Sequence, residues 1–102
     1  MRRAVLIGLL LSLPARGAEP LRVGSKKFTE SVILGEIVTQ LAVSQGIAVE
    51  HRRELGGTQI LWKGLLAGEI DVYPEYTGTI IEEILAGSGV RGLYEAREKL
   101  RA

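Results

Sequence analysis

The sequence predicts an α/β fold in which a largely parallel sheet is flanked by helices. Strand-like alternation and helix-like periodicity follow one another three times between residues 21 and 85, with glycine or proline at the breaks. Such a succession is typical of a parallel sheet covered by helices. The composition agrees, because 46% hydrophobic and 25% charged residues are the proportions of a globular domain.

The first unit combines a short strand with a long helix. Residues 21–24 alternate apolar and polar side chains, and polar loop residues follow at 25–29. Thr29 is a suitable N-cap, and Gly46 is a suitable stop for the helix between them. An apolar stripe recurs along this helix at three- and four-residue spacing: Ile33, Leu34, Ile37, Val38 and Leu41.

The later units are shorter. Residues 47–55 alternate as a strand with one charged edge, and Gly56-Gly57 ends it. Thr58 is the N-cap candidate of a second helix, whose inward residues are Ile60, Leu61, Leu65 and Leu66. A third strand at 70–73 is stopped by Pro74. A third helix follows with Ile80, Ile81, Ile84 and Leu85 inside, and a last helical pattern runs over 93–100.

The first 17 residues have the plan of a cleavable signal peptide. Two arginines follow Met1, residues 4–13 are mostly apolar, and small residues surround the favoured cleavage point after Gly17. Cleavage after Ala18 is the alternative. The apolar stretch is shorter than the roughly 20 residues of a membrane span. We therefore expect a signal peptide at 1–17 and an exported, periplasmic domain at 18–102.

Composition excludes several classes of site. Cysteine is absent and histidine occurs once, so we expect no disulfide, metal site or other cofactor. Basic residues do not form the runs of a nucleic-acid surface, and nucleic acid is not an expected partner. Asp71 and Glu75 flank Tyr73, which is itself expected in the core. These carboxylates have no acid, base or metal partner in the pattern, and His51 lies on a charged strand edge.

Polar loops follow each predicted strand, at residues 25–29, 56–58 and 74–79. In a parallel sheet the C-terminal ends of the strands meet at one edge, where ligands bind beside helix N-termini. We therefore expect the functional residues in these three loops.

The same loops lie in motifs that resemble a known family. GSKKFTESVILGEI at 24–37 and ELGGTQILWKGLLAGEIDVYPEYTGTIIEEIL at 54–85 are similar to the substrate-binding proteins of ABC importers for glycine betaine, choline and other osmoprotectants. The resemblance implies a periplasmic-binding-protein (type II) fold, in which two α/β lobes close on the ligand. The present chain would supply the N-terminal lobe, with the second lobe missing.

The resemblance also implies site residues. Lys26 matches a position whose polar side chain helps to hold the ligand, Tyr76 an aromatic cage wall, and Thr79 a hydroxyl donor to the ligand carboxylate. Backbone donors at Gly57 and Thr58 add a helix N-terminus that favours an anion. A trimethylammonium group has no proton to donate, so aromatic faces suit it. The alternatives are a loop-packing Tyr76, a solvated Lys26 and a helix-capping Thr79.

The implied function is periplasmic capture of a quaternary ammonium osmolyte for an ABC permease and its ATPase at the inner membrane, without catalysis. One alternative is an exported single-lobe interaction module with no independent ligand binding. The other is a small exported enzyme with Asp71 or Glu75 as the base, which lacks a nucleophile elbow, phosphate loop or metal cluster.

Overall fold

A computed structural model describes residues 19–101, so the predicted signal peptide at 1–17 lies outside the described residues. The described elements are strands and helices in an alternating order, followed by a helical C-terminal part. They are β1 (Leu21–Gly24), α2 (Thr29–Ser44), β2 (Val49–Arg52), α3 (Thr58–Leu66), α4 (Thr77–Thr79), the π-helical turn η2 (Ile80–Ile84) and α5 (Leu93–Arg101).

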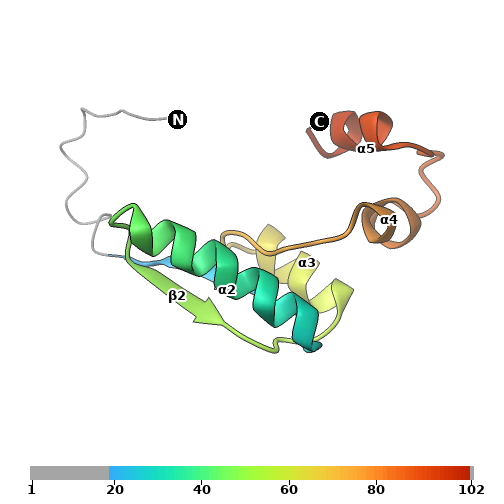
Figure 1. The fold of residues 1–102 in the computed structure, drawn as a ribbon. Coiled ribbons are helices and arrows are strands. Elements are labelled where there is room, and N and C mark those ends of the chain that lie inside the picture. The colour runs from blue at the N-terminus through green and yellow to red at the C-terminus, as the bar shows by residue number, and fades with distance from the viewer. Residues whose placement is uncertain (1–18, 102) are drawn as a thin grey trace.

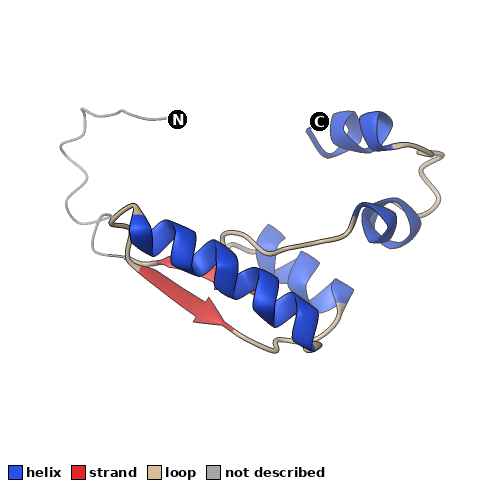
Figure 2. Ribbon diagram, in the orientation of Figure 1, coloured by secondary structure: helices blue, strands red, loops and turns tan. Residues whose placement is uncertain are grey.

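The two strands form a parallel pair covered by helices, which confirms the predicted α/β class. Leu21 lies opposite Val49, and Gly24 lies opposite Arg52. Helix α2 crosses one face of the strands and α3 lies on the other (Figure 1, Figure 2). The core between the layers is small, and its most buried apolar side chains are Val23, Leu61 and Ile70.

The predicted third strand is reduced to a single parallel bridge between Val23 and Val72. The orientation was predicted correctly, but the length was not. The physical reason is Asp71, whose carboxylate accepts the Arg22 backbone N–H at 2.8 Å, where a regular ladder would use a carbonyl. Pro74 then prevents any extension. Strand β2 is also shorter than the predicted 47–55.

Neither predicted threonine cap is made. Phe28 occupies the N-cap position of α2 and Gly57 that of α3, and no side-chain hydrogen bond caps either helix. Thr29 and Thr58 are instead the first helical residues. This releases the Thr58 hydroxyl for a contact with another loop, described below.

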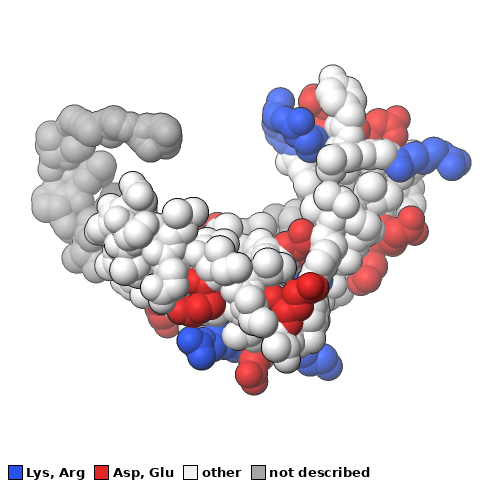
Figure 3. Space-filling view, viewed as in Figure 1, with Lys and Arg blue, Asp and Glu red and all other residues white. Residues whose placement is uncertain are grey.

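The apolar stripe predicted for α2 is only partly buried: Leu34 and Val38 are half-buried. Ile33, Ile37 and Leu41 are all more than half exposed, whereas the buried residues on α2 are Ser31, Gly35 and Thr39. These small side chains allow the helix to lie close to the strands, which turns the branched side chains outward. Figure 3 shows largely uncharged surface over this helix, broken by acidic groups.

The C-terminal part stands away from the layer of α2 and the strands (Figure 1). The predicted third helix forms as the short α4 followed by η2, and its inward residues Ile80, Ile81, Ile84 and Leu85 are only half-buried. Ala96 of α5 is buried. Within residues 19–101, no helix combines the length and hydropathy needed to cross a bilayer.

Two helical glycines test the close approach of α2. A Cβ at Gly35 would lie 2.6 Å from His51 Nε2, whereas one at Gly64 of α3 has its nearest contact at 3.7 Å. Alanine normally stabilises a helix interior relative to glycine. We expect Gly35→Ala to lower the free energy of unfolding by about 1–3 kcal/mol through overpacking.

The matched control is Gly64→Ala, which we expect to raise the free energy of unfolding by up to about 1 kcal/mol. Urea unfolding of both variants measures the difference. Equal and stabilising effects at the two positions would contradict the close approach of α2 to His51.

Candidate ligand-binding site

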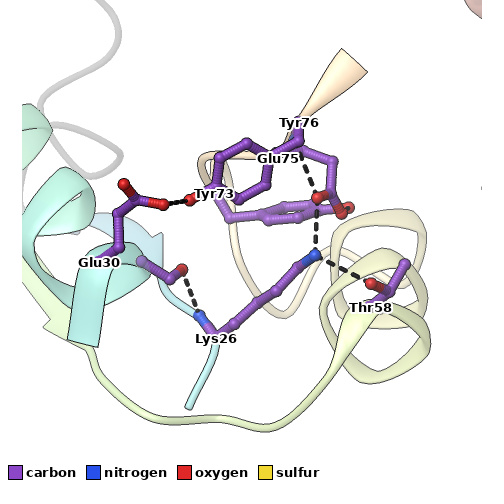
Figure 4. Close-up of polar contacts among 7 residues, drawn as sticks. Lys26, Glu30, Thr58, Tyr73, Glu75 and Tyr76 are labelled. Carbon is purple, nitrogen blue, oxygen red and sulfur yellow. Dashed lines mark hydrogen bonds and ion pairs between the residues drawn. The ribbon is translucent and has the colours of Figure 1, made fainter. Parts of the chain in front are cut away.

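The three predicted loops meet at the side chain of Lys26. Its ammonium group donates to Thr58 Oγ1 at 2.8 Å and to Glu75 Oε1 at 2.6 Å (Figure 4). These residues come from the loop after β1, the first turn of α3 and the segment after the Val72 bridge. The loops therefore meet at one edge of the sheet, as the sequence predicted, although the sequence did not identify Glu75 as the partner of Lys26.

Glu75 is the most connected group of the site. Besides Lys26, it accepts the Tyr76 backbone N–H at 2.9 Å and the Tyr73 hydroxyl at 3.1 Å. The side chains of Lys26 and Glu75 are only 5% and 7% exposed. Burial, and then the adjacent Glu75 charge, raise the pKa of Tyr73, which therefore stays a hydrogen-bond donor. Tyr73 is half-buried, so the core position predicted for it is only partly reached.

Two aromatic rings lie beside this ion pair at the surface. The rings of Phe28 and Tyr76 are stacked, with centroids 6.3 Å apart and planes at 23°. Both remain about two-fifths exposed. Sequence reasoning gave Phe28 no role, although its position two residues after Lys26 in the same loop was an available signal. Together the rings offer apolar faces next to a polar, charge-balanced cluster.

The Tyr76 hydroxyl donates to the Glu30 carboxylate in the first turn of α2 (Figure 4). This hydrogen bond raises the pKa of Tyr76. A phenol that donates to a carboxylate gains electron density in its ring, and a more negative ring face attracts cations more strongly. The Glu30 carboxylate also places negative charge close to the rings.

Thr79 and Gly57 lie at the ends of short segments. Thr79 is the last residue of α4, is half-buried, and makes no side-chain cap to η2. Among the described residues, no hydrogen bond joins it to Lys26 or Tyr76. Gly57 is exposed at the N-cap of α3. Of the predicted site residues, the structure thus brings three into one hydrogen-bonded cluster: Lys26 donates to Thr58 and to Glu75, and Glu75 accepts the Tyr76 backbone N–H.

Asp71 and Glu75 are both committed to ion pairs. Arg22 holds Asp71 with an Nη2 to Oδ1 distance of 3.0 Å, and its hydrogen bonds lower the pKa of that carboxyl group. Glu75 holds Lys26. Among residues 19–101, no three His, Cys, Asp or Glu side chains gather as a metal site would need.

A second polar network lies behind the Lys26 loop and was missed by sequence reasoning. The side chain of His51 on β2 is only 5% exposed, and it contacts Ser25 and Glu36. Hydrogen bonds from Gln40 and from His51 hold the pKa of Glu36 down, to about 2. The alternating pattern of β2 gave no signal for this, because the partners of His51 lie 15 and 26 positions away in the chain.

The buried ion pair gives a stability prediction. We expect Glu75→Gln to lower the free energy of unfolding by about 3–5 kcal/mol, because it leaves the Lys26 charge buried without a counter-ion. The control is Glu98→Gln at the exposed pair with Arg101, for which we expect about 0.5 kcal/mol or less. Urea unfolding at neutral pH compares the two. Similar small losses would show that water reaches Lys26.

Glu36 gives a prediction for acid unfolding. Its pKa in the folded chain is depressed from the ordinary 4.5 to about 2, so its contribution is complete above pH 4.5 and is lost as the pH falls toward 2. We expect the stability of Glu36→Gln to fall less than that of the unaltered chain between about pH 6 and pH 3. Urea unfolding of both proteins at about pH 6 and at about pH 3 measures this difference in stability. Identical pH dependence in the two proteins would contradict it.

The chain is similar to a known protein family and to two characterised proteins. Residues 19–101 match the family described as the substrate binding domain of the ABC-type glycine betaine transport system. The glycine betaine-binding protein YehZ of Escherichia coli is 43% identical over 68 residues, which are 67% of this chain and 22% of that protein. The ergothioneine transport permease/ergothioneine binding protein EgtU of Helicobacter pylori is 37% identical over 84 residues, covering 74% of this chain and 15% of that protein.

Among solved structures, apo YehZ from Escherichia coli superimposes with a TM-score of 0.68 at 32% identity. The similarity covers 81% of this chain and 30% of that one. The described chain therefore spans between about one seventh and one third of the length of these relatives.

Proposed function

Because the chain belongs to the family of substrate-binding domains of ABC-type glycine betaine transport systems, we propose that it captures a quaternary ammonium osmolyte and delivers it to an ABC permease driven by an ATPase. The capture takes place in the periplasm after removal of the predicted signal peptide. The protein acts by binding, and the energy for transport comes from its partners.

The observation that carries the proposal is the exposed aromatic face beside Lys26. Tyr76 and Phe28 keep about two-fifths of their surface accessible, and the Tyr76 hydroxyl is engaged by a carboxylate. A tetraalkylammonium ion cannot form ordinary hydrogen bonds through its nitrogen, so ring faces and nearby negative charge are what hold it. This edge of the sheet supplies both, and α/β sheets bind ligands at this edge.

The ligand class follows from the relatives and from the polar end of the site. The names of the two relatives refer to glycine betaine and ergothioneine, and both molecules combine a trimethylammonium group with a carboxylate. Lys26 has one ammonium proton left after its bonds to Thr58 and Glu75. We assign that donor, the Thr79 hydroxyl and the backbone at Gly57 and Thr58 to the carboxylate. Choline, which lacks a carboxylate, would use only the aromatic end.

Binding rather than catalysis agrees with the state of the acidic side chains. A general base needs a carboxylate that is free to take a proton from a substrate. Asp71 and Glu75 are each held by a cation, and Glu75 accepts two further hydrogen bonds. The exported-enzyme alternative therefore finds no support in these two residues.

The test is calorimetric titration of glycine betaine into the full chain and three variants. Loss of a cation–π contact is worth about 0.5–2 kcal/mol, so we expect Tyr76→Ala to weaken binding by about 2- to 30-fold. Tyr76→Phe keeps the ring and loses only the bond to Glu30, so a smaller loss is expected. The control is Tyr94→Ala on exposed α5, which should bind as the unaltered chain does.

Parallel titrations with choline and ergothioneine then define the ligand class. Equal affinity of Tyr76→Ala and Tyr94→Ala for glycine betaine would exclude the aromatic site. No binding of any of the three amines to the unaltered chain would refute ligand capture.

A further inference from the structure

His51 is a buried ionisable group that the proposed function does not use. It is the chain's single histidine, and it lies in β2 between the strands and α2. Its Nε2 is 3.0 Å from Ser25 Oγ, and its Nδ1 is 2.9 Å from Glu36 Oε1. Arg53 also contacts that Glu36 oxygen, at 3.2 Å. The network thus joins the loop after β1, the middle of α2 and the end of β2.

The chemistry of the partners assigns the protons of this network. Glu36 is ionised at neutral pH and accepts only, so the Nδ1 of His51 carries a hydrogen. In the neutral ring, Nε2 then accepts the Ser25 hydroxyl proton, and in the charged ring Nε2–H donates to the Ser25 oxygen. The bond to Ser25 is available in both states, so the contact does not depend on the charge of the ring.

The order Ser25, His51, Glu36 is that of a hydrolytic triad, but its position rules out that use. Ser25 is completely buried, and a nucleophile must reach its substrate. Its backbone is equally enclosed: its N–H donates to the Arg52 carbonyl at 3.1 Å, and its carbonyl accepts from Leu55 at 3.0 Å. The network therefore holds Ser25 in place.

What Ser25 positions is the next residue, Lys26. The backbone N–H of Lys26 donates to Ser31 Oγ at 2.7 Å. The side chain of Lys26 donates to Thr58 and to Glu75. A rotation of the Ser25 peptide would move the Lys26 Cα and hence the ammonium group. The space around the ring is also closed, since a Cβ on Gly35 would meet Nε2 at 2.6 Å.

We propose that His51 is a positioning residue of the ligand site, which holds Ser25 through Nε2 and thereby sets the position of Lys26. The proposal rests on the proposed function for its effect on affinity. Its effect on the Lys26 loop is independent of any ligand.

Two amide variants of His51 distinguish the roles of its two ring nitrogens. The glutamine amide reaches as far as Nε2 and keeps a polar group for Ser25, whereas the asparagine amide reaches only the position of Nδ1. Loss of one buried hydrogen bond corresponds to about a 5- to 10-fold change in an equilibrium constant. We expect His51→Asn to weaken glycine betaine binding by about that factor, and His51→Gln to remain within about twofold of the unaltered chain.

Three further measurements distinguish positioning from general stability. In a Lys26→Met background, His51→Asn should cause no additional loss of affinity. Ser25→Ala, which leaves the ring intact, should reproduce the effect of His51→Asn. Without ligand, the Lys26 amide should exchange its hydrogen faster in His51→Asn than in His51→Gln, with the core amide of Leu61 as the reference.

Each outcome decides a separate point. Equal losses of affinity in His51→Asn and His51→Gln, or full additivity with Lys26→Met, would overturn the positioning role. If the unaltered chain does not bind glycine betaine, the proposed function fails, and hydrogen exchange at Lys26 alone decides the role of His51. Unchanged exchange at Lys26 in both variants would then refute it.

Discussion

The ion pair between Lys26 and Glu75 is the contact on which the candidate site depends. It joins two segments 49 positions apart in the chain, and both side chains are almost completely buried. Removing two charges from water costs several kcal/mol, so such a pair persists only when its remaining polar atoms also have partners. Thr58, the Tyr73 hydroxyl and the Tyr76 backbone supply them. The pair therefore fixes the relative positions of the two segments more than it adds to the net free energy of folding.

The aromatic surface follows from the same pair. Tyr76 is the residue after Glu75, which accepts its backbone N–H, and Phe28 is two residues after Lys26. When the ion pair closes, both rings are brought to the same edge and stack. Strand β1 delivers Lys26 to this edge, while the bridge at Val72 delivers Glu75, so even a reduced third strand fixes the site.

The sequence predicted those features that depend on local pattern. Alternation and helical periodicity gave the α/β class, the parallel orientation and the edge at which the loops meet. They did not give the buried face of α2, because periodicity identifies a stripe but not which stripe a close neighbour selects. Here the buried residues are Ser31, Gly35 and Thr39, and three of the five residues of the apolar stripe are exposed. The Asp71 contact that shortens the third strand is likewise a side-chain event with no periodic signal.

The remaining features that the sequence did not predict depend on contacts between residues that are distant in the chain. Lys26 was expected to face a ligand carboxylate, but its charge is already balanced by Glu75. Lys26 and Glu75 balance each other, while the Glu30 carboxylate contacts the aromatic pair directly through the Tyr76 hydroxyl. Under the proposal, a ligand at this edge contacts the ring faces and the Glu30 charge, and the third ammonium proton of Lys26 is left for its carboxylate. In the proposed function the ammonium end of the ligand supplies most of the attraction, and the carboxylate end determines its orientation.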